Sequence, residues 1–103
     1  MEVDACSNGI VPPATFWPEL RRVTRERGVY LVADEVMSGF GRCGEWFAWQ
    51  RYGADNRPDL MTVAKGLTGA AAPLGAVVLS AEVYGKIERE MFWGGLTYCG
   101  HQL

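Results

Sequence analysis

Short apolar runs alternate with amphipathic, charge-bearing stretches along this 103-residue chain. The runs at 29–33 (VYLVA), 60–64 (LMTVA) and 75–80 (GAVVLS) have the length of β-strands, and almost every position in them is apolar. Continuous apolarity over so few residues is typical of strands that are buried on both faces of a parallel sheet. Because helical stretches separate the runs, the pattern predicts an α/β fold with a mostly parallel sheet and flanking helices.

Three stretches have the periodicity or the end signals of helices. The first covers about 16–27, with Thr15 as its N-terminal cap and Gly28 at its end. The second covers 45–52, and the third covers 80–90 and begins at Ser80. In the first helix, the side chains expected to pack on the sheet form one stripe: Phe16, Leu20, Val23 and, beside them, Trp17.

Composition narrows the class of protein. The net charge is −2 and the basic residues are scattered, so the chain lacks the charged surface that binds nucleic acid or an acidic membrane. No apolar run approaches the ~20 residues that cross a bilayer, and we recognise no secretory signal. Cys6, Cys43 and Cys99 are odd in number and far apart, which favours reduced thiols and a cytoplasmic protein. Cys99 and His101 lack the further ligands that a metal site needs, so we expect no metal.

The segment at 31–44 (LVADEVMSGFGRCG) contains the pattern G-x-G-x-x-G at Gly39, Gly41 and Gly44. In a dinucleotide-binding turn, the first glycine follows its strand directly, and an acid about 20 residues later ends the next strand. Asp59 has this spacing but precedes its strand, and five residues separate the apolar run from Gly39. We therefore expect the glycines to shape a tight loop. A nucleotide-binding α/β module that uses Gly39–Gly44 is the alternative function from another class.

Polar side chains follow two of the predicted strands. Asp34 and Glu35 end the first strand, and because side chains alternate along a strand, Asp34 and Val36 should share one face and Glu35 the other. A flat ring could be held by Asp34 at its edge and by Val36 against its face. Lys65 follows the second strand, where partial burial would make its amine a nucleophile for a carbonyl. A salt bridge between Asp34 and Lys65, or a solvated loop lysine, is the plainer alternative.

Three blocks of sequence carry a resemblance to a known family. The blocks LVADEVMSGFGRCGEWFA (31–48), PDLMTVAKGLTGAAAPLGAVVLS (58–80) and GGLTYCGHQL (94–103) resemble, in this order, the class III aminotransferases, which use pyridoxal phosphate. The resemblance extends over essentially all 103 residues. It implies the central part of the large, cofactor-binding domain of fold type I. The N-terminal part of that domain and the C-terminal small domain are expected to lie outside 1–103.

The resemblance also implies roles for four residues. Lys65 would be the catalytic lysine, which binds pyridoxal phosphate as a Schiff base and then moves the substrate proton. Asp34 would pair with the pyridine nitrogen of the cofactor, and Val36 would pack on the face of its ring. Thr97 would bind the phosphate of the cofactor held by the neighbouring subunit.

Other positions of the family motifs are assigned no chemical step. Glu35 and Arg42 lie in the motif and would have structural or orienting roles. Cys43 stands where threonine is usual, Cys99 where serine is common, and Gln102 where proline is common after the histidine. None of these departures removes a catalytic group.

The activity that the resemblance implies is amino-group transfer. A ping-pong transaminase would move the amino group of an amine or omega-amino acid to pyruvate or 2-oxoglutarate, with closest resemblance to the omega-amino acid and taurine–pyruvate enzymes. The shared active site implies at least a homodimer. An aminomutase of the same fold is the nearest chemical alternative, because it shares the lysine and the aspartate, and a fragment without function is a further alternative. We expect the isolated chain to be inactive or nearly so.

Overall fold

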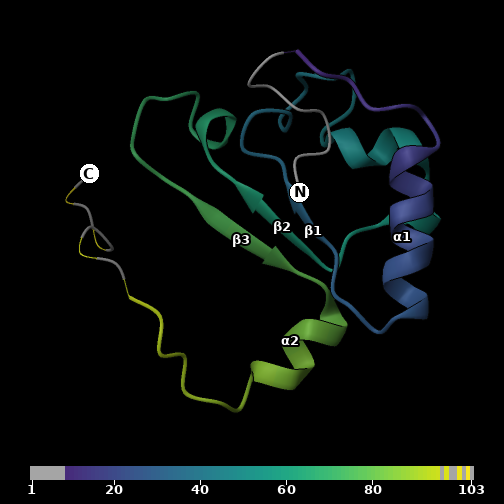
Figure 1. Cartoon of the computed structure of the whole chain (residues 1–103). Helices are drawn as coiled ribbons and strands as arrows, with labels where there is room; N and C mark the ends of the chain where they lie inside the picture. The colour runs from purple at the N-terminus through teal and green to yellow at the C-terminus, as the bar shows by residue number, and fades with distance from the viewer. Residues whose placement is uncertain (1–8, 96, 98–99, 101, 103) are drawn as a thin grey trace.

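The computed structural model describes residues 9–95, 97, 100 and 102. A three-stranded sheet with the order β1–β2–β3 lies at its centre, with β1 at Val32–Asp34, β2 at Leu60–Val63 and β3 at Ala76–Leu79. β1 and β2 are parallel, whereas β3 runs antiparallel to β2 (Figure 1). The predicted α/β class is confirmed. The sheet is mixed rather than mostly parallel, because β3 is antiparallel to β2. The sequence did not predict this direction, since an apolar run carries no information about strand direction.

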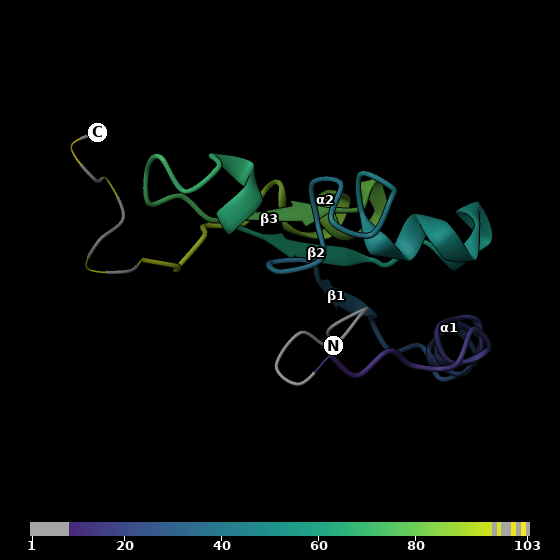
Figure 2. The ribbon, with the colours of Figure 1, turned by 90° about the horizontal axis from the view of Figure 1, so that it is seen from above.

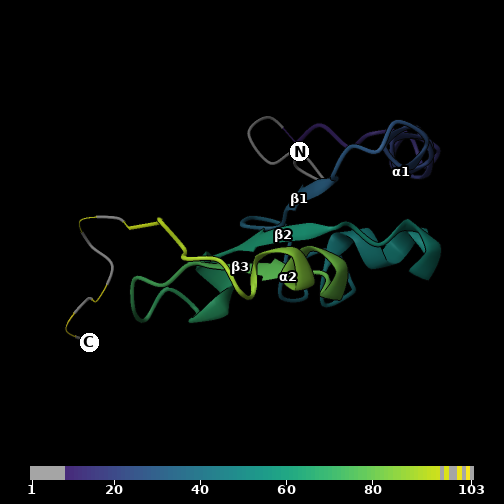
Figure 3. The same ribbon diagram turned by 90° about the horizontal axis from the view of Figure 1, so that it is seen from below.

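Helices flank the sheet on two sides. Among the described residues, α1 covers Phe16–Glu26 and α2 covers Ala81–Ile87, and the 3-10 helices are η1 at Ala48–Tyr52, η2 at Ala54–Asn56 and η3 at Lys65–Leu67. α1 lies beyond β1 and contacts η1 and η2, whereas α2 contacts β3 (Figures 1 and 2). Seen from below, β1 lies between α1 and the β2–β3 pair (Figure 3).

The helix expected at 45–52 is shorter and more tightly wound in the structure. η1 begins only at Ala48, because the preceding Phe47 is extended, with φ −135° and ψ 140°. The amide of Phe40 donates a hydrogen bond to the carbonyl of Trp46 at 2.6 Å, which holds residues before Ala48 in a turn. Gly53 follows the end of η1 with φ 86°, a positive value that glycine adopts without the steric cost of a side chain.

Burial along the strands differs from what continuous apolarity predicted. Leu31 and Ala33 are buried, but Val32 between them is 37% exposed. In β3, Val77 and Val78 point to opposite faces and are 58% and 48% exposed. The prediction that the strands are buried on both faces is therefore wrong for β1 and β3, since the described elements leave one face of β1 and both faces of β3 open.

The side of α1 that packs on the sheet also differs from the predicted stripe. Phe16 and Val23 are 37% and 40% exposed, whereas Trp17 is fully buried. The indole Nε1 of Trp17 donates a hydrogen bond to the carbonyl of Asn56 at 2.9 Å. Arg21, one turn after Trp17, is buried too, so a charged residue occupies part of the packed face and rotates the stripe away from Phe16 and Val23. The core residues are Trp17, Leu31, Ala33, Ala48, Met61 and Val63.

The N-termini of the two α-helices offer a matched test of capping. The hydroxyl of Ser80 accepts a hydrogen bond from the amide of Val83 at 3.3 Å, so the predicted cap of α2 is confirmed. Thr15 has helical backbone angles, φ −81° and ψ −16°, and its side chain makes no capping hydrogen bond, so that predicted cap is wrong. We expect Ser80→Ala to lower the free energy of unfolding by about 0.5–2 kcal/mol.

The control is Thr15→Ala, which should change the free energy of unfolding by less than about 0.5 kcal/mol. Urea titrations followed by far-UV circular dichroism measure both values. Equal losses in the two variants would contradict the difference between the caps.

Two further features concern the described residues as a whole. Within them, no helix is long and apolar enough to cross a membrane. No group of three or more histidine, cysteine, aspartate or glutamate side chains is placed there to hold a metal ion. Cys6, Cys99 and His101, weighed above as thiols or metal ligands, lie outside the described residues.

Candidate active site

A cavity of about 450 Å³ lies beside the loops that follow β1 and β2. Because these strands are parallel, their carboxyl ends share one edge of the sheet. Ligands of α/β sheets gather outside this edge. Among the described residues, the charged side chains of the lining are Arg42 from the first loop and Lys65 from the second, and none of the described acidic side chains lines the cavity. The lining is therefore positive and suits an anionic ligand.

Asp34 and Val36 lie together where β1 ends. The Oδ1 atom of the half-buried Asp34 accepts a hydrogen bond from the amide of Val36 at 3.0 Å. Val36 lines the cavity, whereas Asp34 is next to the lining rather than part of it. The amide of Glu35 donates to the carbonyl of Thr62 at 2.9 Å, which continues the pairing of β1 with β2 to the start of the loop. The carboxylate of Asp34 is thus held at the end of β1 by the amide of Val36, two residues later in the chain.

Glu35 is fully buried and fixes the loop after β1 from the inside. Its carboxylate accepts hydrogen bonds from the amides of Ala48 and Trp49, at 3.0 and 2.9 Å, and from the hydroxyl of Ser38 at 2.5 Å. These amides belong to the first turn of η1, whose N–H groups have no partner within the helix. Glu35 therefore joins the end of β1 to η1, which agrees with the alternation predicted along the strand and with a structural role.

Lys65 begins η3, directly after β2, and its side chain is exposed at the cavity. The Nζ atom contacts the Sδ atom of Met37, which also lines the cavity. No ion pair joins Lys65 to Asp34, although the structure describes both residues, so the salt bridge considered as the plainer alternative is absent. The expectation of a partly buried amine is not met in the described part of the chain, where Lys65 is exposed, as in the alternative of a solvated loop lysine.

The chain has only one other lysine, Lys86 in α2. Its ammonium donates hydrogen bonds to the hydroxyl of Tyr30 and to the carboxylate of Glu82. The hydrogen bond to Tyr30 and then that to Glu82 raise the pKa of Lys86 above its ordinary value. Because only the neutral amine attacks a carbonyl, the raised pKa makes Lys86 less reactive at neutral pH than an ordinary lysine.

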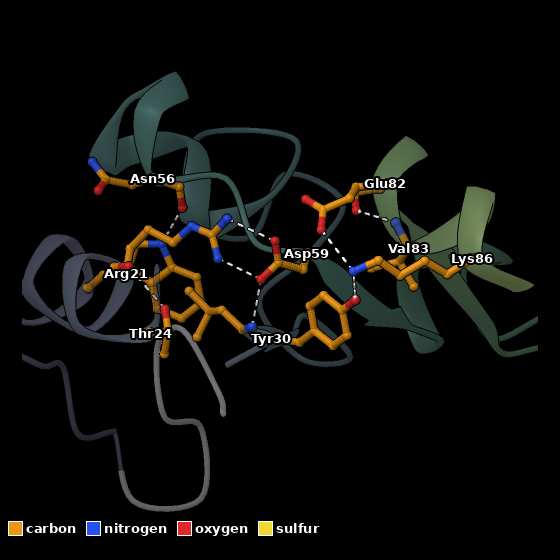
Figure 4. A network of polar contacts seen from close by, with 11 residues as sticks. Arg21, Thr24, Tyr30, Asn56, Asp59, Glu82, Val83 and Lys86 are labelled. Atoms are coloured by element: carbon orange, nitrogen blue, oxygen red, sulfur yellow. Dashed lines mark hydrogen bonds and ion pairs between the residues drawn. The ribbon is translucent and has the colours of Figure 1, made fainter. Parts of the chain in front are cut away.

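Asp59 directly precedes β2, at the edge of the sheet opposite the cavity, and forms a buried ion pair with Arg21 (Figure 4). Its carboxylate accepts two hydrogen bonds from the guanidinium of Arg21, at 2.6 and 2.8 Å, and one from the amide of Leu31 at 2.7 Å. Burial alone would raise the pKa of Asp59, but the bonds from Arg21 and Leu31 and the charges of Arg21 and Arg25 hold it below its ordinary value. Asp59 therefore ties α1 to the strands.

The glycines at 39–44 shape a loop and do not open a helix. A Cβ atom at Gly39 would lie 2.7 Å from the carbonyl oxygen of Glu35, so the chain approaches itself too closely there for any other residue. Gly41 and Gly44 have φ values of 92° and 90°. Since no helix begins at these glycines and Asp59 is occupied by Arg21, the parts of a dinucleotide site are missing, and the nucleotide-binding alternative is not supported.

The family is decided by comparison with known proteins. The sequence pattern of the family described as "Aminotransferase class-III" matches residues 6–103 of this chain. The chain belongs to the class III aminotransferases. The putrescine–pyruvate aminotransferase of Pseudomonas aeruginosa is 47% identical over 93 residues, which are 89% of this chain and 20% of that enzyme. The omega-aminotransferase of Caulobacter vibrioides is 40% identical over 110 aligned positions, covering 100% of this chain and 24% of that enzyme.

Solved structures of aminotransferases have the same fold over this stretch. An S-selective transaminase from Arthrobacter sp. matches with a TM-score of 0.87 and 39% identity, over 94% of this chain and 21% of that chain. The taurine:2-oxoglutarate aminotransferase of Bifidobacterium kashiwanohense, solved with PLP and glutamate, matches with a TM-score of 0.80 and 39% identity. It covers 87% of this chain and 20% of that chain. The chain thus spans about a fifth of the length of these class III aminotransferases.

The structure brings some of the candidate residues of this class III chain together and leaves one apart. Val36 and Lys65 line one cavity, and Asp34 adjoins it, whereas Thr97 is exposed and is not among the lining residues. Sequence reasoning missed the contact between Met37 and Lys65. It also missed the ion pair of Arg21 with Asp59. The sequence did contain a signal for it, because Arg21 lies one helical turn after Trp17 and therefore on the same face of the helix.

Proposed function

We propose that this chain supplies the lysine-bearing part of the large domain of a pyridoxal-phosphate-dependent transaminase. The single observation that carries the proposal is the lysine amine of Lys65 in a positive cavity at the shared carboxyl edge of two parallel strands, with Val36 in the same lining and Asp34 adjoining it. Membership in the class III aminotransferases supports the same assignment.

The residues at the cavity fit pyridoxal phosphate chemically. When bound, the cofactor supplies an aldehyde that reacts with amines and a ring that withdraws electrons from the substrate. Lys65 would attach the cofactor covalently and would hold or deliver a proton at Nζ. The carboxylate of Asp34 would accept a hydrogen bond from the protonated ring nitrogen and keep the proton there. Val36 would cover one ring face and exclude water from it.

Thr97 is the residue proposed to bind the cofactor phosphate of a partner subunit. Because this side chain is exposed and is not part of the cavity lining of its own chain, it suits a contact with the cofactor of a second copy. The hydroxyl of a threonine can donate one hydrogen bond and accept two, which fits a phosphate oxygen. We therefore propose a homodimer, or a higher assembly, in which active sites are shared. The same proposal includes a cytoplasmic location.

The proposed reaction moves an amino group from an amine or an omega-amino acid to a 2-oxo acid, pyruvate or 2-oxoglutarate. The names of the relatives support this range: one transfers from putrescine to pyruvate, and another from diaminobutyrate to 2-oxoglutarate. The 103 residues would not perform the reaction alone, because the remainder of such an enzyme would supply the substrate pocket.

Asp34 offers the test of cofactor binding. We expect Asp34→Ala to weaken the binding of pyridoxal phosphate about 10-fold or more, since a hydrogen bond to a charged group is worth about 1.5–3 kcal/mol. Equilibrium dialysis of the chain against pyridoxal phosphate measures the dissociation constants. The control is Asp55→Ala, which removes an exposed aspartate of η2 and should leave the constant unchanged.

Equal dissociation constants for Asp34→Ala and Asp55→Ala would contradict the role proposed for Asp34. A nicotinamide dinucleotide in a parallel dialysis cell tests the alternative. Binding of the dinucleotide in place of pyridoxal phosphate would revive the nucleotide-binding interpretation of residues 39–44.

A further inference from the structure

Three residues other than glycine have a left-handed backbone conformation in the described part of the chain, and all three lie in the two loops at the cavity. They are Phe40, with φ 63°, Lys65, with φ 36°, and Ala70, with φ 64°. A side chain makes this conformation costly, so it persists only where the surrounding structure enforces it. At Lys65, the residue on which the proposed function depends, neighbouring residues must therefore enforce this conformation.

Gly66 brings the two loops into direct contact. A Cβ atom at Gly66 would lie 2.8 Å from the Cβ atom of Phe40 and 3.0 Å from its Cδ2 atom. The aromatic side chain therefore rests on the bare backbone of the residue that follows Lys65. Because the Cβ atom of Phe40 is attached directly to the main chain, the contact could not be relieved by a simple rotation of the ring.

Phe40 is itself held by two residues that precede η1, Trp46 and Phe47. Its amide donates a hydrogen bond to the carbonyl of Trp46 at 2.6 Å. Its ring meets that of Phe47 edge to face, with 5.5 Å between the ring centres. Phe47 precedes η1, whose first amides bind the buried carboxylate of Glu35. A continuous set of contacts thus runs from the end of β1, through η1 and Phe40, to the loop after β2.

Hydrogen bonds within the second loop complete the support of Lys65. The amide of Leu67 donates to the carbonyl of Ala64 at 2.8 Å, and the amide of Ala70 donates to the carbonyl of Lys65 at 3.1 Å. These bonds fix the shape of the loop but do not connect it to β1. The side chain of Phe40 makes that connection at Gly66.

We infer that Phe40 is a positioning residue for Lys65: by resting on Gly66, it holds the lysine in its left-handed conformation and keeps the amine at the cavity. This inference rests on the proposed function, because it assigns Phe40 a task at the cofactor lysine. It adds a residue that is not among those lining the cavity. Phe40 acts through the backbone of its neighbour across the two loops.

Amide hydrogen exchange of the cofactor-free chain tests the connection. The variant Phe40→Gly removes the ring and also relieves the left-handed backbone at position 40, so the chain should keep its fold. We expect the amides of Leu67 and Ala70 to exchange about 3- to 10-fold faster, the range for the loss of one aromatic packing contact. The amides of β2 and β3 should exchange as before.

Two further variants sharpen the comparison. Phe40→Tyr keeps a ring on Gly66 and should restore the slow exchange of the loop. Phe92→Ala removes a phenylalanine that is 84% exposed, and it should change neither loop nor sheet. Unchanged exchange of Leu67 and Ala70 in Phe40→Gly would overturn the inference. Equal acceleration in the loop and in β2 would overturn it too, because Phe40 would then be an ordinary core residue.

Labelling with pyridoxal phosphate and borohydride gives a second measurement. In Phe40→Gly, the share of label on Lys65 relative to Lys86 should fall about 3-fold or more, in step with the exchange of the loop. Absence of label on Lys65 in the unaltered chain would count against the proposed function alone, since the exchange measurement needs no cofactor. Accelerated loop exchange with an unchanged share of label would overturn the positioning role of Phe40 alone.

Discussion

Asp59→Asn is expected to lower the free energy of unfolding by about 3–5 kcal/mol, the usual cost of leaving a buried charge without its partner. The side chains of Arg21 and Asp59 are only 9% and 12% exposed, and two short hydrogen bonds join them. Asparagine can still accept the hydrogen bond from the amide of Leu31. It cannot balance the charge of Arg21, whose Nε atom already has no hydrogen-bond partner among the described residues.

Urea unfolding followed by tryptophan fluorescence measures this loss. The matched control is Glu19→Gln, which breaks an ion pair with Arg22 on the exposed side of the same helix, where the side chains are 53% and 63% exposed. The control should cost less than about 1 kcal/mol, because water screens such a pair. Similar losses in the two variants would show that the pair of Arg21 and Asp59 is not the contact that ties α1 to the sheet.

The ion pair of Arg21 and Asp59 should make the free energy of unfolding fall as the pH is lowered. The pKa of Asp59 is lower in the folded chain than its ordinary value, so the unfolded chain binds a proton more readily at this site. The contribution of Asp59 is complete above about pH 4–5, near the ordinary pKa of an aspartate, and is lost as the pH falls through the lower, folded value. The free energy of unfolding should fall less steeply with decreasing pH in Asp59→Asn than in the unaltered chain. An identical fall in the two would contradict the lowered pKa of Asp59 as its cause.

Glu35→Ala should have the second largest effect, about 3 kcal/mol of unfolding free energy, because it leaves two buried donors and one partly buried donor without an acceptor. The amides of Ala48 and Trp49 and the hydroxyl of Ser38 all donate to this one carboxylate. Since Glu35 follows Asp34, its loss should also free the end of β1 and weaken the binding of pyridoxal phosphate.

Thermal unfolding and equilibrium dialysis measure the two consequences separately. Glu45→Ala is the control, because Glu45 is an exposed acid of the same loop. Its removal should leave both quantities close to those of the unaltered chain. If Glu35→Ala behaved like Glu45→Ala, the carboxylate would not be the anchor of η1.

The sequence predicted the elements of this fold better than their burial. Apolar runs located all three strands, and Ser80 located the start of α2, because these signals are local. The packed face of α1 was misjudged, since the burial of Arg21 depends on Asp59, 38 positions away in the chain. The direction of β3 and the open faces of the sheet likewise depend on long-range partners that no periodicity records.

In the candidate site, too, local patterns were predicted from the sequence and contacts between distant loops were not. The predicted alternation separated the buried Glu35 from Val36, which lines the cavity, but it did not predict that Asp34 lies outside the lining. The order of strands and loops brought Lys65 to the same edge. The contact of Phe40 with Gly66 and that of Met37 with Lys65 could not be predicted, because each joins two loops whose shapes are set by left-handed residues rather than by a repeating pattern.

Borohydride reduction in the presence of pyridoxal phosphate, followed by peptide mass mapping, tests most directly whether Lys65 is the cofactor lysine. The chain offers a built-in comparison, because its only other lysine, Lys86, has a raised pKa from its hydrogen bonds to Tyr30 and Glu82. We predict that the label is concentrated on Lys65 and that Lys65→Ala loses it without a gain at Lys86. Label shared equally by the two lysines, or confined to Lys86, would contradict the assignment of Lys65.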